Sequence, residues 1–184
     1  MRIIYTLDEM IETARGWLAA GSVGFVPTTG DLHASHMALV KAAQEECEIC
    51  IVSIFVNPLQ FASVEELAHI PRPLERDLQL LKDVQVDVVF VPRAEDIYPP
   101  TFSTYITPII TKTEHIDQEK TFQNTPIYTY GFATILTKLF QIVRPDVAYF
   151  RQGATPEVAI VQKLVQDLNI DVSLRILPKD DILA

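Results

Sequence analysis

The chain has 184 residues, of which 48% are apolar and 21% are charged, which is enough apolar content for one ordinary hydrophobic core. This composition argues against a globally disordered protein. The formal net charge of −9 argues against a nucleic-acid partner, because phosphate neutralisation needs clustered lysine and arginine. The longest apolar runs are too short to cross a bilayer, and Asp8 and Glu12 follow the N-terminus too closely for a signal peptide. We therefore expect a cytoplasmic protein with no membrane partner.

Helices and strands are predicted to alternate along the chain. The first helix is expected over 6–20, with Thr6 as its cap and Gly21 as its stop. Pro73 is expected as a first helical residue. Apolar residues at helical spacing predict further helices at about 34–46, from 73 onward, over 132–143 and over 158–168. Apolar runs predict strands at 22–27, 50–56, 86–92, 147–150 and 172–177. Before the 132–143 helix the pattern is weak, and only a short strand near Tyr105 is expected there.

This alternation predicts an α/β fold of the Rossmann-like, doubly wound kind. The unbroken apolar run from Cys50 to Val56 is typical of a parallel strand that is buried on both faces. Right-handed crossovers would then place helices on both faces of a mostly parallel sheet. Such sheets bind ligands beyond the carboxyl ends of their strands. Three loops are predicted to converge there, namely 27–36, 57–60 and 151–157.

Cys47 and Cys50 form a CxxC pair, which invites a redox or a metal interpretation. A zinc site would need four ligands, and the sequence has no second pair of cysteines. Redox pairs usually lie in a turn that opens a helix, whereas this pair leads directly into a predicted strand. We therefore expect Cys50 to be a core residue.

The segment Val26–His36 joins an apolar strand to a helix and is the most informative feature of the chain. His33 and His36 are three residues apart, so they share one helix face. Both imidazoles would donate hydrogen bonds to nucleotide phosphates docked on the positive end of that helix. The alternative is structural, with one histidine capping the helix and the other packing on the surface. Gly30 permits a positive φ, which serves either a ligand turn or an ordinary one. Asp31 suits a cap but would repel a nearby phosphate.

Asn57 and Gln60 enclose a proline directly after the predicted 50–56 strand. Their side-chain amides would hold the hydroxyl or carboxylate groups of a small polar acid at the predicted cleft. The alternative is that they only satisfy backbone groups of the loop.

Six segments in order along the chain resemble pantothenate synthetase, which is also called pantoate–β-alanine ligase. The most specific of them is the string SIFVNPLQF at 53–61. The resemblance extends from the N-terminus to about Leu177. The segments are Gly24-Phe25-Val26-Pro27-Thr28, Leu32-His33-x-x-His36, Val52–Phe61, Pro71-Arg72-x-Leu74-Glu75-Arg76-Asp77-Leu78, Val86–Pro92 and Lys138–Phe150.

The resemblance implies a Rossmann domain of the HIGH-type nucleotidylyltransferases. In that family the pantoate carboxylate attacks the α-phosphorus of ATP, which gives pantoyl adenylate and pyrophosphate. The amine of β-alanine then displaces AMP, and Mg2+ assists by sharing phosphate charge. The family forms dimers, so the resemblance also implies a homodimer.

Carried over by position, His33 and His36 would contact ATP phosphates as catalytic residues. Gln60 would hold pantoate, with Asn57 nearby, and Glu157 would occupy a second pantoate position. The nucleotide and pantoate cleft would be lined by Pro27, Thr28, Thr29 and Gly30.

Several departures from the family pattern fall on the implied site. In the first turn Thr29, Asp31 and Ser35 replace the family's Met, Ala and Gly. After Phe150 the family has Gly-Glu-Lys-Asp-x-x-Gln, and its lysine, aspartate and glutamine correspond here to Gly153, Ala154 and Glu157. The charge of Glu157 would oppose a substrate carboxylate. Arg151 and Lys163 are the candidates to replace the missing lysine, although neither is in register.

We expect one domain over 1–184, without the small C-terminal domain that the family adds. The expected function is ATP-dependent ligation of pantoate to β-alanine, with activity impaired by the departures. Two alternatives stay open. One is a non-catalytic relative that binds a small ligand or a partner in the same cleft. The other is a nucleotidylyltransferase that acts on another acid.

Overall fold

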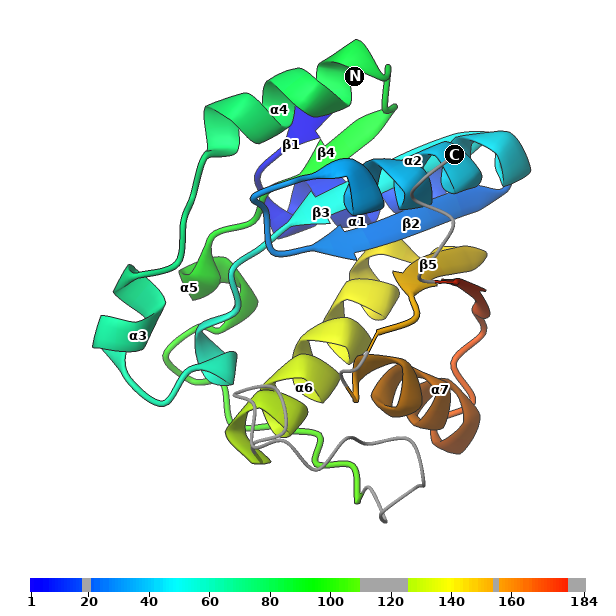
Figure 1. Cartoon of the computed structure of the whole chain (residues 1–184). Coiled ribbons are helices and arrows are strands. Elements are labelled where there is room, and N and C mark those ends of the chain that lie inside the picture. The colour runs from blue at the N-terminus through cyan, green and yellow to red at the C-terminus, as the bar shows by residue number, and fades with distance from the viewer. Residues whose placement is uncertain (18–20, 110–125, 154–155, 179–184) are drawn as a thin grey trace.

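The computed structural model describes residues 1–17, 21–109, 126–153 and 156–178. Its six strands form one sheet in the order β1-β4-β3-β2-β5-β6, and every neighbouring pair is parallel (Figure 1). The strands are β1 (Arg2–Ile4), β2 (Val23–Thr28), β3 (Ile49–Ile54), β4 (Val88–Phe90), β5 (Val147–Arg151) and β6 (Ser173–Leu177). The helices are α1 (Leu7–Trp17), α2 (Ala34–Glu46), η1 (Pro58–Gln60), α3 (Val64–Ala68), α4 (Leu74–Asp83), α5 (Ala94–Ile97), α6 (Pro126–Val143) and α7 (Glu157–Asp167). The predicted α/β fold is confirmed.

The two central strands are buried on both faces, which explains why they read as continuous apolar runs. One face packs against α1, α6 and α7, with Phe25, Phe140 and Ile160 in its core. The other face packs against α2 and α4, with Val26 and Tyr149 in its core. The sheet therefore separates two apolar layers, as expected for a doubly wound fold.

The switch in strand order places the ends of β2 and β5 beside each other. β2 pairs with β3 on one side, through partners such as Phe25 and Ile51, and with β5 on the other, where Phe25 pairs with Ala148. The crossovers from β2 and from β5 leave to opposite sides of this point. The loops after β2 and β5 therefore both leave from the carboxyl end of the sheet, where the candidate site lies.

Several short elements were not predicted, because three to five residues give no readable period. They are β1, α3 and α5. The strand predicted near Tyr105 is wrong, because the described residues around it pair with no strand. The Ile106 backbone N–H instead donates to Thr134 Oγ1 at 3.0 Å. Pro73 precedes α4 as its N-cap instead of opening it. The predicted end of the first helix at Ala20 lies outside the described residues.

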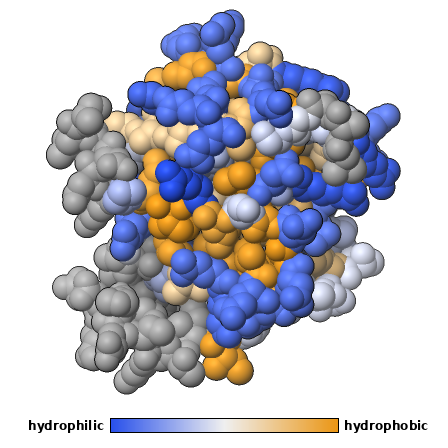
Figure 2. All heavy atoms as spheres, turned by 90° about the vertical axis from the view of Figure 1, so that its right-hand side faces the viewer, coloured by the Kyte–Doolittle hydropathy of each residue, from blue (hydrophilic) through white to orange (hydrophobic). Residues whose placement is uncertain are grey.

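The β6 side of the molecule shows apolar atoms gathered between hydrophilic ones (Figure 2). Near the end of the described chain, half-buried Val172, Leu174 and Ile176 pack against the core, and Leu168 is 47% exposed. Within the described residues, no helix has both the length and the apolar content that a membrane span requires.

Both cysteines are free thiols. Cys50 is 1% exposed in β3, and burial raises the pKa of its thiol to about 12. Cys47 Sγ lies 3.4 Å from the Tyr149 hydroxyl. The prediction that Cys50 is a core residue is confirmed.

Candidate active site at the ends of β2 and β5

The turn after β2 has a left-handed backbone at two successive residues. Gly30 has φ +87° and Asp31 has φ +51°, and the predicted positive φ of Gly30 is therefore confirmed. A Cβ on Gly30 would lie 3.2 Å from Asp77 Oδ2 and 3.2 Å from a methyl of Ile54. Glycine is therefore favoured here by both conformation and space.

Asp77 of α4 holds this turn through two hydrogen bonds. Its carboxylate accepts hydrogen bonds from the backbone N–H of Asp31 at 2.8 Å and of Leu32 at 2.9 Å, and the residue is 1% exposed. Arg76 forms an ion pair with the Asp31 carboxylate at 3.1 Å and donates to the Leu32 carbonyl at 3.2 Å. Asp31, which was expected to repel phosphate, therefore has a cationic partner.

The role of Asp77 was missed, although the sequence carries a signal for it. Leu74, Asp77, Leu78 and Leu81 follow the i, i+3, i+4, i+7 spacing of a buried helix face. A carboxylate at an apolar-face position needs hydrogen-bond donors. The structure supplies them from the turn that precedes α2.

His33 and His36 come together at the start of α2. Their ring centroids are 4.2 Å apart. The backbone N–H of His33 donates to His36 Nδ1 at 3.3 Å, so the neutral His36 ring carries its proton on Nε2. Ser35 Oγ lies 2.7 Å from His33 Nδ1, and Ser35 is buried. The hydroxyl that distinguishes this chain at position 35 therefore orients His33.

Burial lowers the pKa of His36 to about 4, with a further lowering contribution from His33. The positive charge of Arg151 also lowers it, whereas the carboxylates of Asp77 and Asp31 oppose the shift. His36 is therefore neutral at pH 7. Its free Nε2–H can donate a hydrogen bond, but the ring contributes no permanent charge.

The low pKa of His36 predicts a pH-dependent contribution to stability. The unfolded chain binds a proton near pH 6.5 and the folded protein only near pH 4, so stability falls as pH drops between these values. The loss approaches about 3 kcal/mol at most. Urea unfolding from pH 7 to pH 4 should show this slope reduced in His36→Gln. The matched control, His69→Gln on the exposed end of α3, should retain the wild-type slope, and equal slopes in all three proteins would contradict the assignment.

Thr28, Thr29 and Gly30 have different surroundings. The Thr28 hydroxyl donates to the Ser53 carbonyl at 2.7 Å and accepts from the Gly30 N–H at 3.3 Å. Pro27 lies within β2 opposite Ser53. Exposed Thr29 and buried Gly30 line a pocket of about 240 Å³ at the ends of β3 and β4. The lining of that pocket does not include the two histidines, Asn57, Gln60 or Glu157.

Asn57 is occupied by contacts within the protein. Its side-chain amide donates to the Gly131 carbonyl at 2.9 Å, its oxygen accepts from the Leu59 N–H at 3.2 Å, and it is 1% exposed. These contacts fix η1 against α6. The predicted contact of Asn57 with substrate stays untested, and its observed role is to position the loop that carries Gln60.

Gln60, Tyr128 and Glu157 form a polar cluster between η1, α6 and α7. The Tyr128 hydroxyl donates to Glu157 Oε1, and Tyr128 is also hydrogen-bonded by the Gln60 side chain. Burial, followed by the Glu157 charge, raises the pKa of Tyr128 well above its usual value. The structure thus brings together Gln60 and Glu157, and it adds Tyr128. No sequence signal marked Tyr128, because it lies in a helix far from both partners along the chain.

The loop after β5 links this cluster to the histidines. It leaves the sheet at Arg151, whose charge acts on His36, and it leads into α7 at Glu157, which accepts from Tyr128. Gly153 is exposed, and Ala154 lies outside the described residues.

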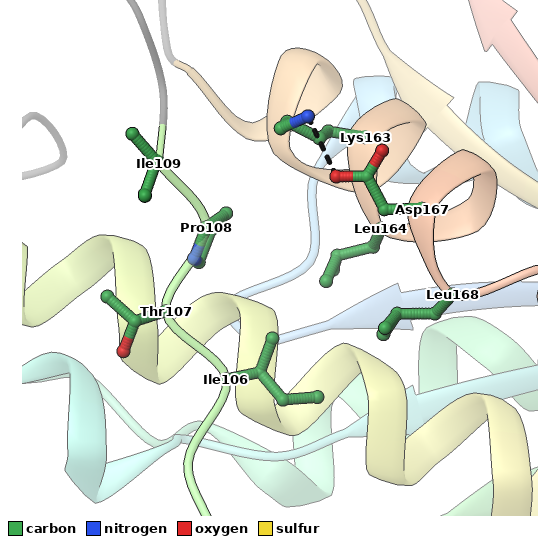
Figure 3. A pocket seen from close by; sticks show the side chains of 8 residues that line it. All are labelled: Ile106, Thr107, Pro108, Ile109, Lys163, Leu164, Asp167 and Leu168. Atoms are coloured by element: carbon green, nitrogen blue, oxygen red, sulfur yellow. Dashed lines mark ion pairs between the residues drawn. The ribbon is translucent and has the colours of Figure 1, made fainter.

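Lys163 lies elsewhere. It forms an ion pair with Asp167 at 2.7 Å, in a pocket of about 430 Å³ between α7 and residues 106–109 (Figure 3). Of the two cations offered by the sequence, only Arg151 is placed at the candidate site.

Across the residues that the structure describes, no three His, Cys, Asp or Glu side chains gather into a group that would hold a metal ion.

Comparison with known proteins assigns the family. The profile of the family described as Pantoate-beta-alanine ligase matches residues 2–180. A pantothenate synthetase of Thermosipho africanus is 44% identical over 179 residues, covering 97% of this chain and 63% of that protein. A pantothenate synthetase of Fervidobacterium nodosum is 40% identical, with 97% of this chain and 62% of that protein covered. The chain thus spans 62–63% of the length of these curated relatives.

Solved structures of the same family are also similar to this chain. The pantoate-beta-alanine ligase of Francisella tularensis, complexed with beta-gamma ATP and β-alanine, superposes with a TM-score of 0.86 at 32% identity, covering 97% of this chain and 67% of that one. The pantothenate synthetase of Thermus thermophilus gives a TM-score of 0.83 at 36% identity, with coverages of 97% and 62%. With matched sequence and matched fold, this chain belongs to the pantoate–β-alanine ligase family.

Proposed function

We propose that this chain binds ATP and pantoate at the ends of β2 and β5 and contributes to ligation of pantoate to β-alanine. The observation that carries the proposal is the paired imidazoles at the N-terminus of α2, with centroids 4.2 Å apart, in a chain of this family. The structure of the Francisella relative in complex with an ATP ligand and β-alanine supports the same ligand classes.

The chemistry follows from the site's donors. The nucleotide phosphates would lie at the N-terminus of α2, where the helix dipole favours anions. The neutral His36 ring would donate Nε2–H to a phosphate oxygen, and His33, oriented by Ser35, would support it. Mg2+ carried by the phosphates would share the negative charge that develops as pyrophosphate leaves.

The acid would lie beside Gln60, which η1 and Asn57 hold in place. There its carboxylate would meet Glu157, whose charge disfavours a second anion. Because Tyr128 already donates to Glu157, that charge is partly compensated. We therefore propose an activity that is weaker than it would be with a neutral residue at position 157.

The proposal is tested by AMP release from Mg·ATP in the presence of pantoate and β-alanine. We expect release that depends on both substrates and falls by roughly 100-fold or more in His36→Ala, the usual cost of removing a transition-state donor. His69→Ala, which changes a histidine outside the site, is the control. If the protein binds Mg·ATP but releases no AMP, a non-catalytic binding role replaces this proposal. If it binds no nucleotide at millimolar Mg·ATP, the proposal fails altogether.

Glu157→Gln should raise the affinity for pantoate, because it removes a negative charge beside the substrate carboxylate while keeping an acceptor for Tyr128. We expect a decrease of roughly 10-fold in the KM for pantoate, which corresponds to about 1.4 kcal/mol. The control is Glu95→Gln on exposed α5, which should leave KM unchanged. An unchanged or increased KM in Glu157→Gln would place the substrate carboxylate away from this residue.

A further inference from the structure

His36 gives the candidate nucleotide site no permanent positive charge. His36 is neutral at pH 7, because its pKa is lowered to about 4. Arg76 of α4, which contacts the turn, is already paired with Asp31 at 3.1 Å. A polyphosphate at the start of α2 would bring several negative charges into a protein whose formal net charge is already −9.

Arg151 lies on the face of the sheet that carries α2. Side chains two residues apart in a strand point to the same face, and Tyr149 packs in the α2 layer with Leu39 and Val40. The Tyr149 hydroxyl reaches Glu46, in the last turn of α2, at 3.1 Å. Because α2 runs back along the sheet, the step from Tyr149 to Arg151 leads toward the first turn of α2.

Strand register gives the same position. The last paired residues of β2 and β5 are Phe25 and Ala148, and Thr28 and Arg151 each lie three residues further toward the carboxyl ends of these strands. The turn to His33 begins directly after Thr28. The electrostatic effect of Arg151 on His36 agrees with this placement.

The guanidinium of Arg151 is available to contact an anion. Arg151 is half-buried, and it forms no ion pair with an acidic side chain of the described residues. Arg175, on the neighbouring strand β6, is by contrast bound to Glu46 at 3.1 Å. An arginine fork without an acidic partner is suited to bidentate contact with phosphate oxygens.

We infer that Arg151 is the fixed positive charge of this site and contacts the phosphates of the bound nucleotide. The inference rests on the proposed function for the identity of the ligand. It assigns phosphate binding to the last residue of β5 and not to the loop that follows.

The experiment measures binding by the full chain of Mg·ATP, tripolyphosphate and adenosine, with Arg151→Ala, Arg151→Lys and the control Arg175→Ala. Arg151→Ala should weaken tripolyphosphate and Mg·ATP binding by roughly 10- to 100-fold, the cost of one charged hydrogen-bond partner, and leave adenosine binding unchanged. Arg151→Lys should recover part of the affinity, and Arg175→Ala should match the wild type. Three outcomes would overturn the inference: equal losses for adenosine and tripolyphosphate, equal losses in Arg151→Ala and Arg175→Ala, or no tripolyphosphate binding by the wild type.

A second readout needs no ligand. NMR titration should show the pKa of His36 rising in Arg151→Ala, because a neighbouring positive charge has been removed, and staying fixed in Arg175→Ala. An unchanged His36 pKa in Arg151→Ala would contradict the placement. If tripolyphosphate binding depends on Arg151 but no AMP is released, the phosphate site stands and the proposed function fails. If AMP release is normal and Arg151→Ala binds and reacts like the wild type, the proposed function stands and this inference fails.

Discussion

Asp77→Ala is expected to reduce the free energy of unfolding by about 2–4 kcal/mol, because it leaves one buried and one part-buried backbone N–H group without an acceptor. Those groups belong to Asp31 and Leu32, at 2.8 and 2.9 Å from the carboxylate. The left-handed backbone of the turn would then lose its main support. Since the turn leads directly to His33, we also expect weaker Mg·ATP binding.

Urea unfolding checks this prediction. Asp83→Ala, an exposed position on the same helix whose carboxylate accepts from Gln79, is the matched control and should change stability by no more than about 0.5 kcal/mol. Asp77→Asn keeps one acceptor oxygen, so its loss of unfolding free energy should lie between those of Asp77→Ala and Asp83→Ala. A loss below about 1 kcal/mol in Asp77→Ala would mean that the turn is held by other contacts.

Gly131→Ala is expected to displace η1 from α6. An added Cβ would lie 2.5 Å from the Leu59 carbonyl oxygen and 2.9 Å from the Gln60 backbone nitrogen, distances that force one element to move. Overpacking of this kind costs about 1–3 kcal/mol. Because the displaced element carries Gln60, we expect the KM for pantoate to rise as well, with less effect on nucleotide binding.

Gly16→Ala provides the matched control, because nothing lies within 4 Å of the Cβ it would add. In α1 this substitution should be neutral or stabilising by up to about 1 kcal/mol. Thermal unfolding and pantoate kinetics of both variants give the comparison. Wild-type stability and KM in Gly131→Ala would show that η1 does not depend on this close approach.

The sheet could be predicted from the sequence because its strands are buried on both faces. The Cys50–Val56 segment is a continuous apolar run, which is typical of such a strand. The helix that contains Leu136 and Phe140 repeats its apolar residues at helical spacing over several turns. The β1, α3 and α5 elements are too short for that. The strand predicted near Tyr105 is wrong because Tyr105 packs between the rings of Phe102 and Tyr130, and the described residues around it pair with no strand.

The candidate site was predictable where its chemistry lies within one turn. His33, His36 and Gly30 are close together in sequence, and the structure brings the two rings together and gives Gly30 its predicted positive φ. His33 is the N-cap of α2 with an extended backbone, so it does not share a helix face with His36 as predicted. Contacts between distant segments could not be predicted. Asp77 lies 46 residues beyond Asp31, and Tyr128 lies 29 residues before Glu157. Only the folded sheet brings these partners together.

The placement of nucleotide at the start of α2 is tested most directly by histidine ring resonances during titration with Mg·ATP. His69, whose Nδ1 contacts the Glu65 carbonyl on exposed α3, is an internal reference within the same molecule. We predict saturable shifts of the His33 and His36 signals while the His69 signal stays in place. Binding of Mg·ATP that leaves both site histidines unperturbed would contradict it.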